Sequence, residues 1–294
     1  MSQKDSLSRF LFDKLQIRGE FVHLDESWRA VLSKHDYPAV VRDVLGEAVA
    51  ATVLLSATIK FLGSITLQIQ GDGPVGMLVV QVNTDKQLRA MASYDEDQSL
   101  AEGLKNLFGE ARLVISIEMG ETGERYQGIV ELSEGSVADA LEEYFRSSEQ
   151  LQTRLWLAAN DEMAAGFLLQ EMPKQEKHDD DDDAWQRSVM LAETLRQEEL
   201  FTLNAQEILH RLYHEEDVRL FKSDQISFSC SCSRERIENT LKSLGEKEVR
   251  EILTEQGNVG VDCNFCNQHY EFDAVDVERL FFSGYAMDMS DTRH

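Results

Sequence analysis

Four cysteines, the only ones in this chain of 294 residues, fall into two close pairs in its last quarter. One residue separates Cys230 from Cys232, two residues separate Cys263 from Cys266, and thirty residues lie between the pairs. Two close thiol pairs joined by a loop-sized spacer are typical of a tetrahedral tetrathiolate site. The spacing therefore predicts that Cys230, Cys232, Cys263 and Cys266 bind one Zn²⁺ ion per chain when the protein is reduced.

The same spacing also suits redox chemistry of the thiols. Thiolates held this close repel one another, and a bound zinc ion relieves that repulsion. Without the ion, each pair can close on itself as a short-range disulfide, so the pattern fits both a metal site and a thiol switch. The remaining interpretation is that the four cysteines are free or paired by accident.

Charge and motif context argue against two other functions. The chain carries 54 acidic and 29 basic residues, a net charge of −25, which repels phosphate backbones. The region 226–282 has six basic and eleven acidic residues, so a zinc-ribbon module that binds nucleic acid is disfavoured. A thiol–disulfide oxidoreductase using Cys263 and Cys266 is also disfavoured. Such pairs usually open a helix, whereas this pair lies in a polar predicted turn.

The sequence also predicts a cytoplasmic protein without a membrane partner. The N-terminal residues contain no apolar segment resembling a signal peptide. The longest apolar stretch, Ala48–Ile59, is interrupted by Thr52, Ser56 and Thr58 and is too short to span a bilayer. In the reducing cytoplasm, clustered cysteines more often bind metal or undergo redox reactions than form structural disulfides.

Residues 1–174 are predicted to form an α+β core domain with an antiparallel sheet. Apolar residues on all sides of the helix expected over 39–61 indicate a buried core helix, and shorter helices are expected over 27–33 and 137–147. Strands are predicted by alternation or short apolar runs over 18–24, 64–70, 75–82, 88–93, 113–119, 126–132, 151–159 and 164–169. The region contains no nucleophile elbow and no phosphate-binding loop, so no enzyme site is expected.

Residues 175–225 are predicted to be an acidic, then amphipathic, helical linker. Five consecutive aspartates, Asp179–Asp183, resist burial and indicate a solvated segment. They lack the glycine and distal glutamate of a calcium loop, so the calcium-binding alternative is disfavoured. From 184 to 222, apolar residues recur near helical spacing and must be buried against a neighbour.

Residues 226–294 are predicted to be a small C-terminal module that contains both cysteine pairs. Helices are expected over 234–244, 246–256 and 276–282, with a strand over 269–273. Few apolar residues are available for a core. Zinc, at about 10–16 kcal/mol for a structural site, would therefore supply much of the module's folding free energy.

The cysteine pattern and the residues around it resemble the redox switch of the bacterial heat-shock protein 33 family. The resemblance rests on Cys230 and Cys232, on the stretch Val259–Phe272 that contains Cys263 and Cys266, and on the turn Gln70–Pro74. It covers essentially the whole chain. The acidic run Asp179–Asp183 is a departure that is not recognised as a family feature.

This resemblance implies a redox-regulated holdase chaperone rather than an enzyme. The four matching cysteines would bind zinc in the inactive, reduced form. Hypochlorite, or peroxide with mild heat, would convert them to the disulfides Cys230–Cys232 and Cys263–Cys266. Zinc would then leave, the module would unfold and the linker would loosen. Unfolding client proteins would bind the exposed surface, and activation would accompany homodimerisation.

Overall fold

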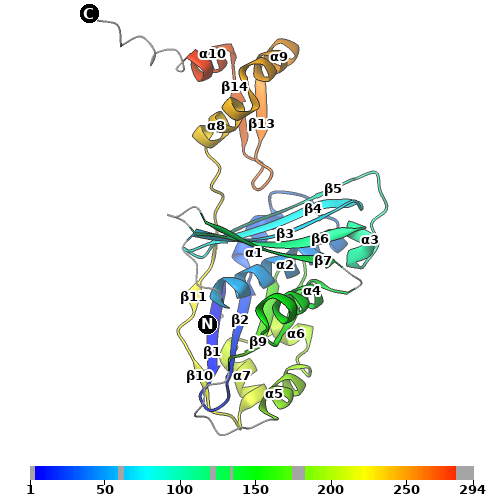
Figure 1. The fold of residues 1–294 in the computed structure, drawn as a ribbon, viewed down its shortest axis with the longest axis vertical. Coiled ribbons are helices and arrows are strands. Elements are labelled where there is room, and N and C mark those ends of the chain that lie inside the picture. The colour runs from blue at the N-terminus through cyan, green and yellow to red at the C-terminus, as the bar shows by residue number, and fades with distance from the viewer. Residues whose placement is uncertain (1–3, 59–62, 120–123, 133–134, 174–182, 283–294) are drawn as a thin grey trace, which may run out of the picture. The chain divides into compact units, whose positions relative to one another are not determined.

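The structure, a computed structural model, describes residues 4–58, 63–119, 124–132, 135–173 and 183–282. The chain divides into two compact units, residues 1–229 and residues 230–294, whose elements are labelled in Figure 1. Of the acidic run Asp179–Asp183, only Asp183 lies within the described residues, where it directly precedes a helix. The prediction made for the rest of that run lies outside them.

A long apolar helix, α2 (Ala39–Thr58), lies at the centre of the first unit (Figure 1). It begins after Pro38, whose carbonyl accepts hydrogen bonds from the N–H groups of Val41 and Arg42. Strands of two different sheets contact α2, and this explains why its sequence is apolar on every side. The predicted buried core helix is confirmed as far as Thr58, and residues 59–61 lie outside the described part of the chain.

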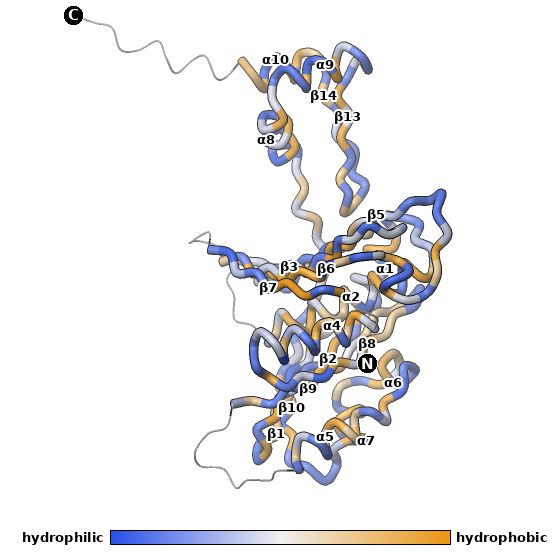
Figure 2. Tube along the Cα trace, turned by 45° about the vertical axis from the view of Figure 1, so that its right-hand side comes forward, coloured by the Kyte–Doolittle hydropathy of each residue, from blue (hydrophilic) through white to orange (hydrophobic). Residues whose placement is uncertain are grey.

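One sheet against α2 is antiparallel, with its described strands in the order β10-β1-β2-β9-β8 and β11 also paired with β1. Consecutive residues of β2 and β9 are buried, so side chains of this sheet are buried on both faces. Figure 2 shows the hydropathy of each residue along the trace of the chain. The strands are β1 (Ser6–Phe12), β2 (Ile17–Leu24), β8 (Thr153–Ala159), β9 (Ala164–Glu171), β10 (Val218–Leu220) and β11 (Asp224–Gln225).

The second sheet has its described strands in the order β12-β5-β4-β3-β6-β7. All neighbours are antiparallel except β12 and β5, which run parallel. The predicted alternation is confirmed: Ile65, Leu67 and Ile69 are buried, whereas Thr66 is only partly buried. The strands are β3 (Gly63–Gly71), β4 (Val75–Asn83), β5 (Gln87–Tyr94), β6 (Ala111–Met119), β7 (Arg125–Leu132) and β12 (Ser227–Phe228).

The glycine-rich turn between β3 and β4 serves packing. The Gly73 N–H donates to the Phe108 carbonyl at 2.9 Å, next to the short helix α3 (Leu104–Phe108). A Cβ atom at Gly73 would lie 2.6 Å from the Gly109 nitrogen, so only glycine fits this close approach. The turn Gln70–Pro74 joins β3 and β4, which pair antiparallel as a hairpin.

Two further helices complete the layer around α2. Helix α1 (Glu26–Leu32) confirms the short helix predicted after β2. Helix α4 (Val137–Tyr144) begins at Ser136, whose hydroxyl accepts a hydrogen bond from the Asp139 N–H at 3.2 Å. It passes into a π-helical turn, Phe145–Glu149, so the regular helix ends earlier than the predicted residue 147.

The amphipathic segment after residue 183 folds as three short helices of the first unit: α5 (Ala184–Ala192), α6 (Gln197–Thr202) and α7 (Ala205–Tyr213). Asn204 caps α7 through a reciprocal pair of hydrogen bonds with Glu207. The apolar faces join aromatic side chains of β1, β2 and β9 in one buried cluster that contains Phe10, Phe12, Phe21, Phe167, Ile208 and Leu212.

The sequence-based assignment failed at two connected places, and it also omitted α3, β11, β12 and the strand over 259–262. The helical pattern expected up to residue 222 ends at Tyr213, and Val218–Leu220 forms strand β10 instead. Its partner is β1, a strand that the sequence did not predict. Strand β10 has only three residues, too few to show alternation, and it forms because β1 satisfies its backbone groups. Strand β1 is held on its other side by β2.

The second unit is small. Helices α8 (Arg234–Leu244), α9 (Glu246–Gln256) and α10 (Ala274–Phe282) accompany a hairpin of β13 (Val259–Asp262) and β14 (His269–Phe272). Among the described residues its buried apolar core comprises Leu241, Val249, Val259, Phe272, Val277 and Leu280. The predicted α+β fold, with antiparallel sheets and a small cysteine-bearing C-terminal unit, is confirmed.

Candidate metal centre

The two cysteine pairs come from different segments of the second unit. Cys230 and Cys232 lie in the irregular stretch between β12 and α8. Cys263 and Cys266 lie in the turn between β13 and β14. Folding of the β13–β14 hairpin against the helices is therefore needed to bring the second pair to the first.

The turn between β13 and β14 is built to point two sulfurs in one direction. The Cys263 carbonyl accepts hydrogen bonds from the N–H groups of Cys266 at 3.3 Å and Asn267 at 2.8 Å. The Cys263 N–H donates to the Gln268 carbonyl at 3.0 Å, which closes the turn. Asn267 adopts a φ of 56°, a left-handed conformation that asparagine tolerates better than most residues.

All four sulfurs lie within 4.8 Å of one another. The Cys230 and Cys263 sulfurs are 3.7 Å apart, and the Cys232 and Cys266 sulfurs are 3.4 Å apart. A tetrahedron with zinc–sulfur bonds of about 2.3 Å has edges of roughly 3.8 Å. The four free thiols therefore have the donor type and the spacing that a tetrahedral zinc site needs. Among the described residues, this is the group of potential metal ligands that the structure brings together.

The thiols differ in their tendency to ionise. Burial opposes ionisation of Cys232, but hydrogen bonds from the Tyr270 hydroxyl and from Cys266 lower its pKa to about 7. Burial raises the pKa of Cys230, and it raises the pKa of Cys266 to about 12. One thiolate thus forms readily, and further negative charge beside it is costly without a cation. A divalent ion would remove that cost.

Three side chains hold the loops that carry the sulfurs. The Tyr270 hydroxyl, on β14, donates to the Cys232 sulfur at 3.2 Å. Arg236 donates to the Ser231 hydroxyl at 2.6 Å, between the first two cysteines. Arg234 lies over the Phe272 ring at 4.3 Å and donates to the Glu271 carbonyl at 3.0 Å. The contacts of Tyr270 and Arg234 connect the region at the start of α8 to β14, and the contact of Arg236 holds the loop before α8.

Sequence reasoning named all four cysteines but gave Tyr270 no role at the site. The sequence around Tyr270 gives little indication of a role at the site, because a tyrosine in a predicted strand four residues after Cys266 is usually interpreted as a packing residue. The hydroxyl reaches Cys232 because the segment of Cys230 and Cys232 lies beside β14 in the folded unit, and a single sequence does not contain this proximity.

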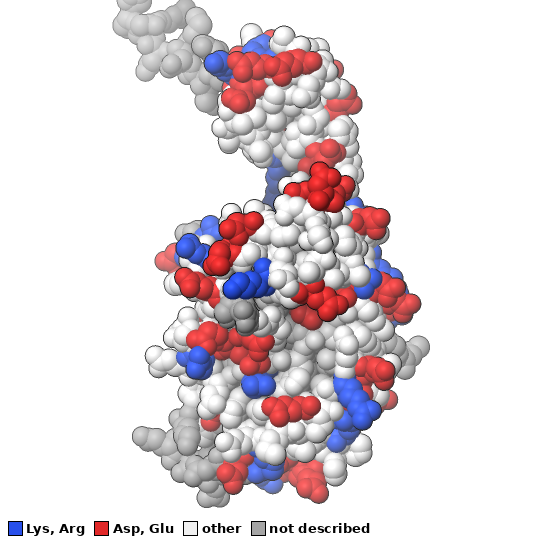
Figure 3. Space-filling model, turned by 90° about the vertical axis from the view of Figure 1, so that its right-hand side faces the viewer, with Lys and Arg blue, Asp and Glu red and all other residues white. Residues whose placement is uncertain are grey.

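The surroundings of the centre differ from those of the two alternatives. Cys263 and Cys266 lie in a turn between strands rather than at the start of a helix, unlike the redox pair of a thiol–disulfide oxidoreductase. On the face drawn in Figure 3, acidic side chains are interspersed with isolated basic ones, and no continuous basic surface gathers on the described part of that face. Within the described residues, no helix is both long and apolar enough to cross a bilayer.

Comparisons with known proteins agree with this architecture. The family description "Hsp33 protein" matches residues 5–273. A 33 kDa chaperonin of Nitrosococcus oceani is 50% identical over 294 residues, covering 100% of both chains. One of Shewanella oneidensis is 46% identical over 283 residues, covering 96% of this chain and 98% of the relative.

A solved structure shares the fold. The crystal structure of the 33 kDa chaperonin from Thermotoga maritima superimposes with a TM-score of 0.82 at 22% sequence identity, covering 95% of this chain and 99% of the other. Together with the match over nearly the whole sequence and the clustered thiols, these similarities lead to one conclusion: this chain belongs to the Hsp33 family of chaperones.

Proposed function

We propose that this protein is a redox-regulated holdase, inactive when reduced and active when its four cysteines are oxidised. One observation carries the proposal: four thiol sulfurs lie within 4.8 Å of one another in a unit with a very small apolar core. The relatives named 33 kDa chaperonin support a chaperone rather than an enzyme.

In the reduced state, Cys230, Cys232, Cys263 and Cys266 would hold one Zn²⁺ ion. The bound ion would keep all four thiols deprotonated and add its binding free energy to the folding of the module. The Tyr270 hydroxyl would stabilise negative charge on Cys232, and Arg236 would hold the loop between Cys230 and Cys232.

Oxidation would proceed by two-electron steps at each pair. A peroxide accepts two electrons and two protons and becomes two water molecules, while two thiolates lose two electrons and form one sulfur–sulfur bond. The family resemblance assigns the bonds to Cys230–Cys232 and Cys263–Cys266. Bridged sulfurs no longer provide four thiolate ligands, so the module loses the stabilisation that the ion gave.

Loss of the module's stability would also affect helices α5–α7 of the first unit. We retain the functional division into a core domain (1–174), a linker (175–225) and a switch module (226–294). Helices α5–α7 cover Phe10, Phe12, Phe21 and Phe167, so loosening of the linker would expose a large apolar surface. Unfolding client proteins would bind there, accompanied by homodimerisation, and we place the protein in the cytoplasm.

The test is an aggregation assay on both redox forms, with released zinc measured alongside. The oxidised protein should suppress aggregation of a heat-denatured client and release about one zinc ion per chain, whereas the reduced protein should do neither. Cys263→Ser with Cys266→Ser should abolish switching, and Ser243→Ala, an exposed position on α8, serves as a control. Equal suppression by the two redox forms would refute regulation, and absence of zinc after reductive purification would refute the metal site.

A further inference from the structure

The segment Val218–Phe228, here called the strap, lies along the edges of both sheets of the first unit. Its first part pairs antiparallel with β1, in the register Phe10 to Leu220 and Phe12 to Val218. The Phe221 N–H donates to the Arg9 carbonyl at 2.9 Å. The strap therefore satisfies edge groups of β1 that would otherwise face solvent.

The second part of the strap covers the edge of β5. The Ser227 N–H donates to the Lys86 carbonyl at 3.1 Å. Directly after the strap, the Ser229 N–H donates to the Leu88 carbonyl at 2.9 Å. Ile226 is 1% exposed and belongs to the large core cluster, while Phe228 packs against that cluster. Cys230 directly follows Ser229, so the backbone hydrogen bond from Ser229 to Leu88 adjoins the first thiol of the switch.

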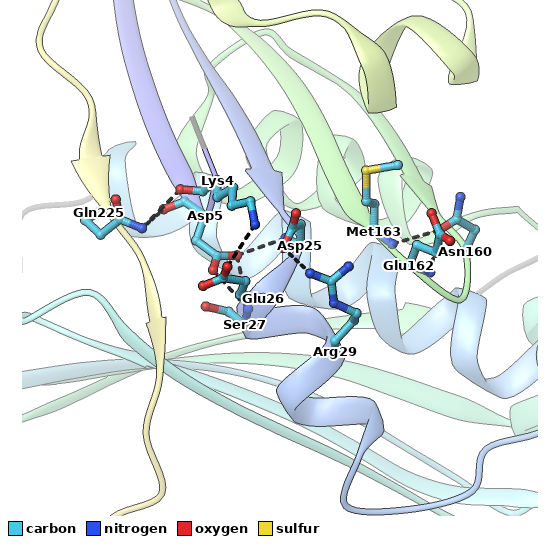
Figure 4. Close-up of polar contacts among 10 residues, drawn as sticks. All are labelled: Lys4, Asp5, Asp25, Glu26, Ser27, Arg29, Asn160, Glu162, Met163 and Gln225. Atoms are coloured by element: carbon cyan, nitrogen blue, oxygen red, sulfur yellow. Dashed lines mark hydrogen bonds and ion pairs between the residues drawn. The ribbon is translucent and has the colours of Figure 1, made fainter. Parts of the chain in front are cut away.

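Asp5 joins the two parts of the strap to the core (Figure 4). The Asp5 carbonyl accepts hydrogen bonds from the Ile226 N–H at 2.7 Å and from the Gln225 side chain at 3.0 Å. Its carboxylate accepts the N–H groups of Asp25 and Ser27 at the start of α1. The midpoint of the strap is therefore held through a residue that also caps a helix.

Apart from Ile226 and Phe228, the apolar side chains of the strap contribute little to holding it in place. Leu220 and Phe221 are 38% and 43% exposed. Two ion pairs, Arg219 with Asp13 at 2.8 Å and Arg9 with Asp224 at 3.3 Å, have exposed side chains and contribute little. A strand held mainly by backbone hydrogen bonds at a sheet edge is among the segments that open most easily.

We propose that the strap occupies two strand-docking sites, the edges of β1 and β5, which bind an extended segment of a client polypeptide once the strap is released. This rests on the proposed function and adds the mode of recognition. Main-chain groups of β1 and β5 supply hydrogen bonds that any extended polypeptide can satisfy, so binding does not require one particular sequence.

The strap's own contacts define the side chains that the β5 edge prefers. Ile226 and Phe228 point into the core while Ser227 between them is exposed, which selects two apolar residues separated by one position. Lys34 lies 5.9 Å from the centre of the Phe228 ring and favours an aromatic residue at the second position. Such segments are common in buried strands and become exposed when a client unfolds.

A labelled synthetic peptide with the sequence of residues 216–229 tests the docking mode. Its fluorescence anisotropy is measured with the full-length oxidised protein and with the reduced, zinc-loaded protein. One peptide is N-methylated at Phe221 and Ser227, whose N–H groups donate to the carbonyls of Arg9 in β1 and of Lys86 directly before β5. The control is N-methylated at Leu220 and Phe228, whose N–H groups strand alternation turns away from these edges.

The oxidised protein should bind the unmodified and control peptides alike, and the peptide methylated at Phe221 and Ser227 at least about tenfold more weakly. The reduced protein should bind all three weakly, because its own strap fills the edges. Equal binding of the two methylated peptides would overturn strand docking. Strand docking would also be overturned if the oxidised protein suppressed aggregation but bound no peptide. It would likewise be overturned if, in a stable dimer, the strap of a second copy occupied the edges and excluded the peptide.

A variant releases the strap without oxidation. Ile226→Asp places a charge in the core cluster, whereas Ser227→Asp places the same charge at the exposed neighbouring position. Reduced Ile226→Asp should bind the peptide and keep its zinc, and Ser227→Asp should behave as wild type. If Ile226→Asp fails to fold, Ile226→Ala replaces it. Peptide binding by an oxidised wild type that cannot suppress aggregation would refute the proposed function while the docking sites stand.

Discussion

At the scale of single residues, Tyr270 contributes a hydrogen bond to the cysteine cluster without being a candidate ligand. Its hydroxyl lies 3.2 Å from the Cys232 sulfur and donates to it. A hydrogen bond to a thiolate spreads its negative charge, which stabilises a crowded set of sulfurs and makes that sulfur less nucleophilic.

Tyr270→Phe should therefore lower zinc affinity by roughly tenfold and speed oxidation of the cysteines. Competition with a chromophoric chelator measures the first effect, and thiol titration during peroxide treatment measures the second. Tyr126→Phe, at a tyrosine that is 59% exposed on β7, is the control. Unchanged zinc affinity in Tyr270→Phe would mean that this hydrogen bond plays no part in holding the metal.

A second single residue, the buried Glu20, makes the free energy of unfolding of the first unit depend on pH. Glu20 is 3% exposed, and its Oε2 atom has no hydrogen-bond partner among the described residues. Burial raises its pKa from 4.5 to about 7, although Arg18 and Arg9 act in the opposite direction. Between these two values the folded state keeps a proton that the unfolded state releases. The free energy of unfolding therefore falls as the pH rises through this window.

Glu20→Gln should remove that dependence. Compared with wild type, it should be more stable above pH 7 by up to about 3 kcal/mol, and about equally stable near pH 4.5. Urea unfolding at several pH values measures this difference. Glu131→Gln, at an exposed position on β7, controls for loss of a carboxylate. A stability difference that does not vary with pH would contradict the assignment to Glu20.

At the scale of elements, helix α7 buries more residues than α5 or α6. Ile208 is fully buried in the cluster that α5–α7 share with β1, β2 and β9, while Gln206 on the same helix is exposed. An amphipathic helix of nine residues owes its stability to this packing rather than to its own propensity.

Ile208→Ala should destabilise the docked linker by about 2–4 kcal/mol and give the reduced, zinc-loaded protein measurable holdase activity. Hydrogen exchange of α7 and the aggregation assay measure the two effects. Gln206→Ala should change neither. A loosened α7 without gain of activity would show that exposure of this cluster is not what binds clients.

At the scale of the whole molecule, the two units differ greatly in what holds them together. Among the described residues, the first unit has two buried apolar clusters, one built around α2 and one around α5–α7. In the described part of the second unit, α8–α10 and the β13–β14 hairpin form one small cluster. A unit of this size usually needs a metal or disulfide framework in addition to its core.

Chelation together with peroxide should therefore unfold residues 230–282 while the core of the first unit survives. Limited proteolysis followed by mass spectrometry should place the new cleavage sites in α8–α10. Zinc-loaded, reduced protein treated with the same protease is the control. Uniform protection after oxidation would show that the thiols do not stabilise the second unit.

The sequence by itself determined the features that depend on local pattern. The spacing of Cys230, Cys232, Cys263 and Cys266 identified the candidate centre, because ligand pairs in tight turns are encoded over a few residues. The apolar run of α2 and the alternation of β3 and β4 revealed a buried helix and a hairpin for the same reason.

Only the tertiary structure decided what joins distant segments. The pairing of β1 with β10, the Tyr270 hydroxyl beside Cys232 and the placement of Ile226 in the core each connect residues that are far apart in the chain. Short edge strands carry almost no pattern of their own, and they form because a partner's backbone groups are available. A partner edge exists only in the folded chain, so the strand pairings of the strap could not be predicted from the sequence.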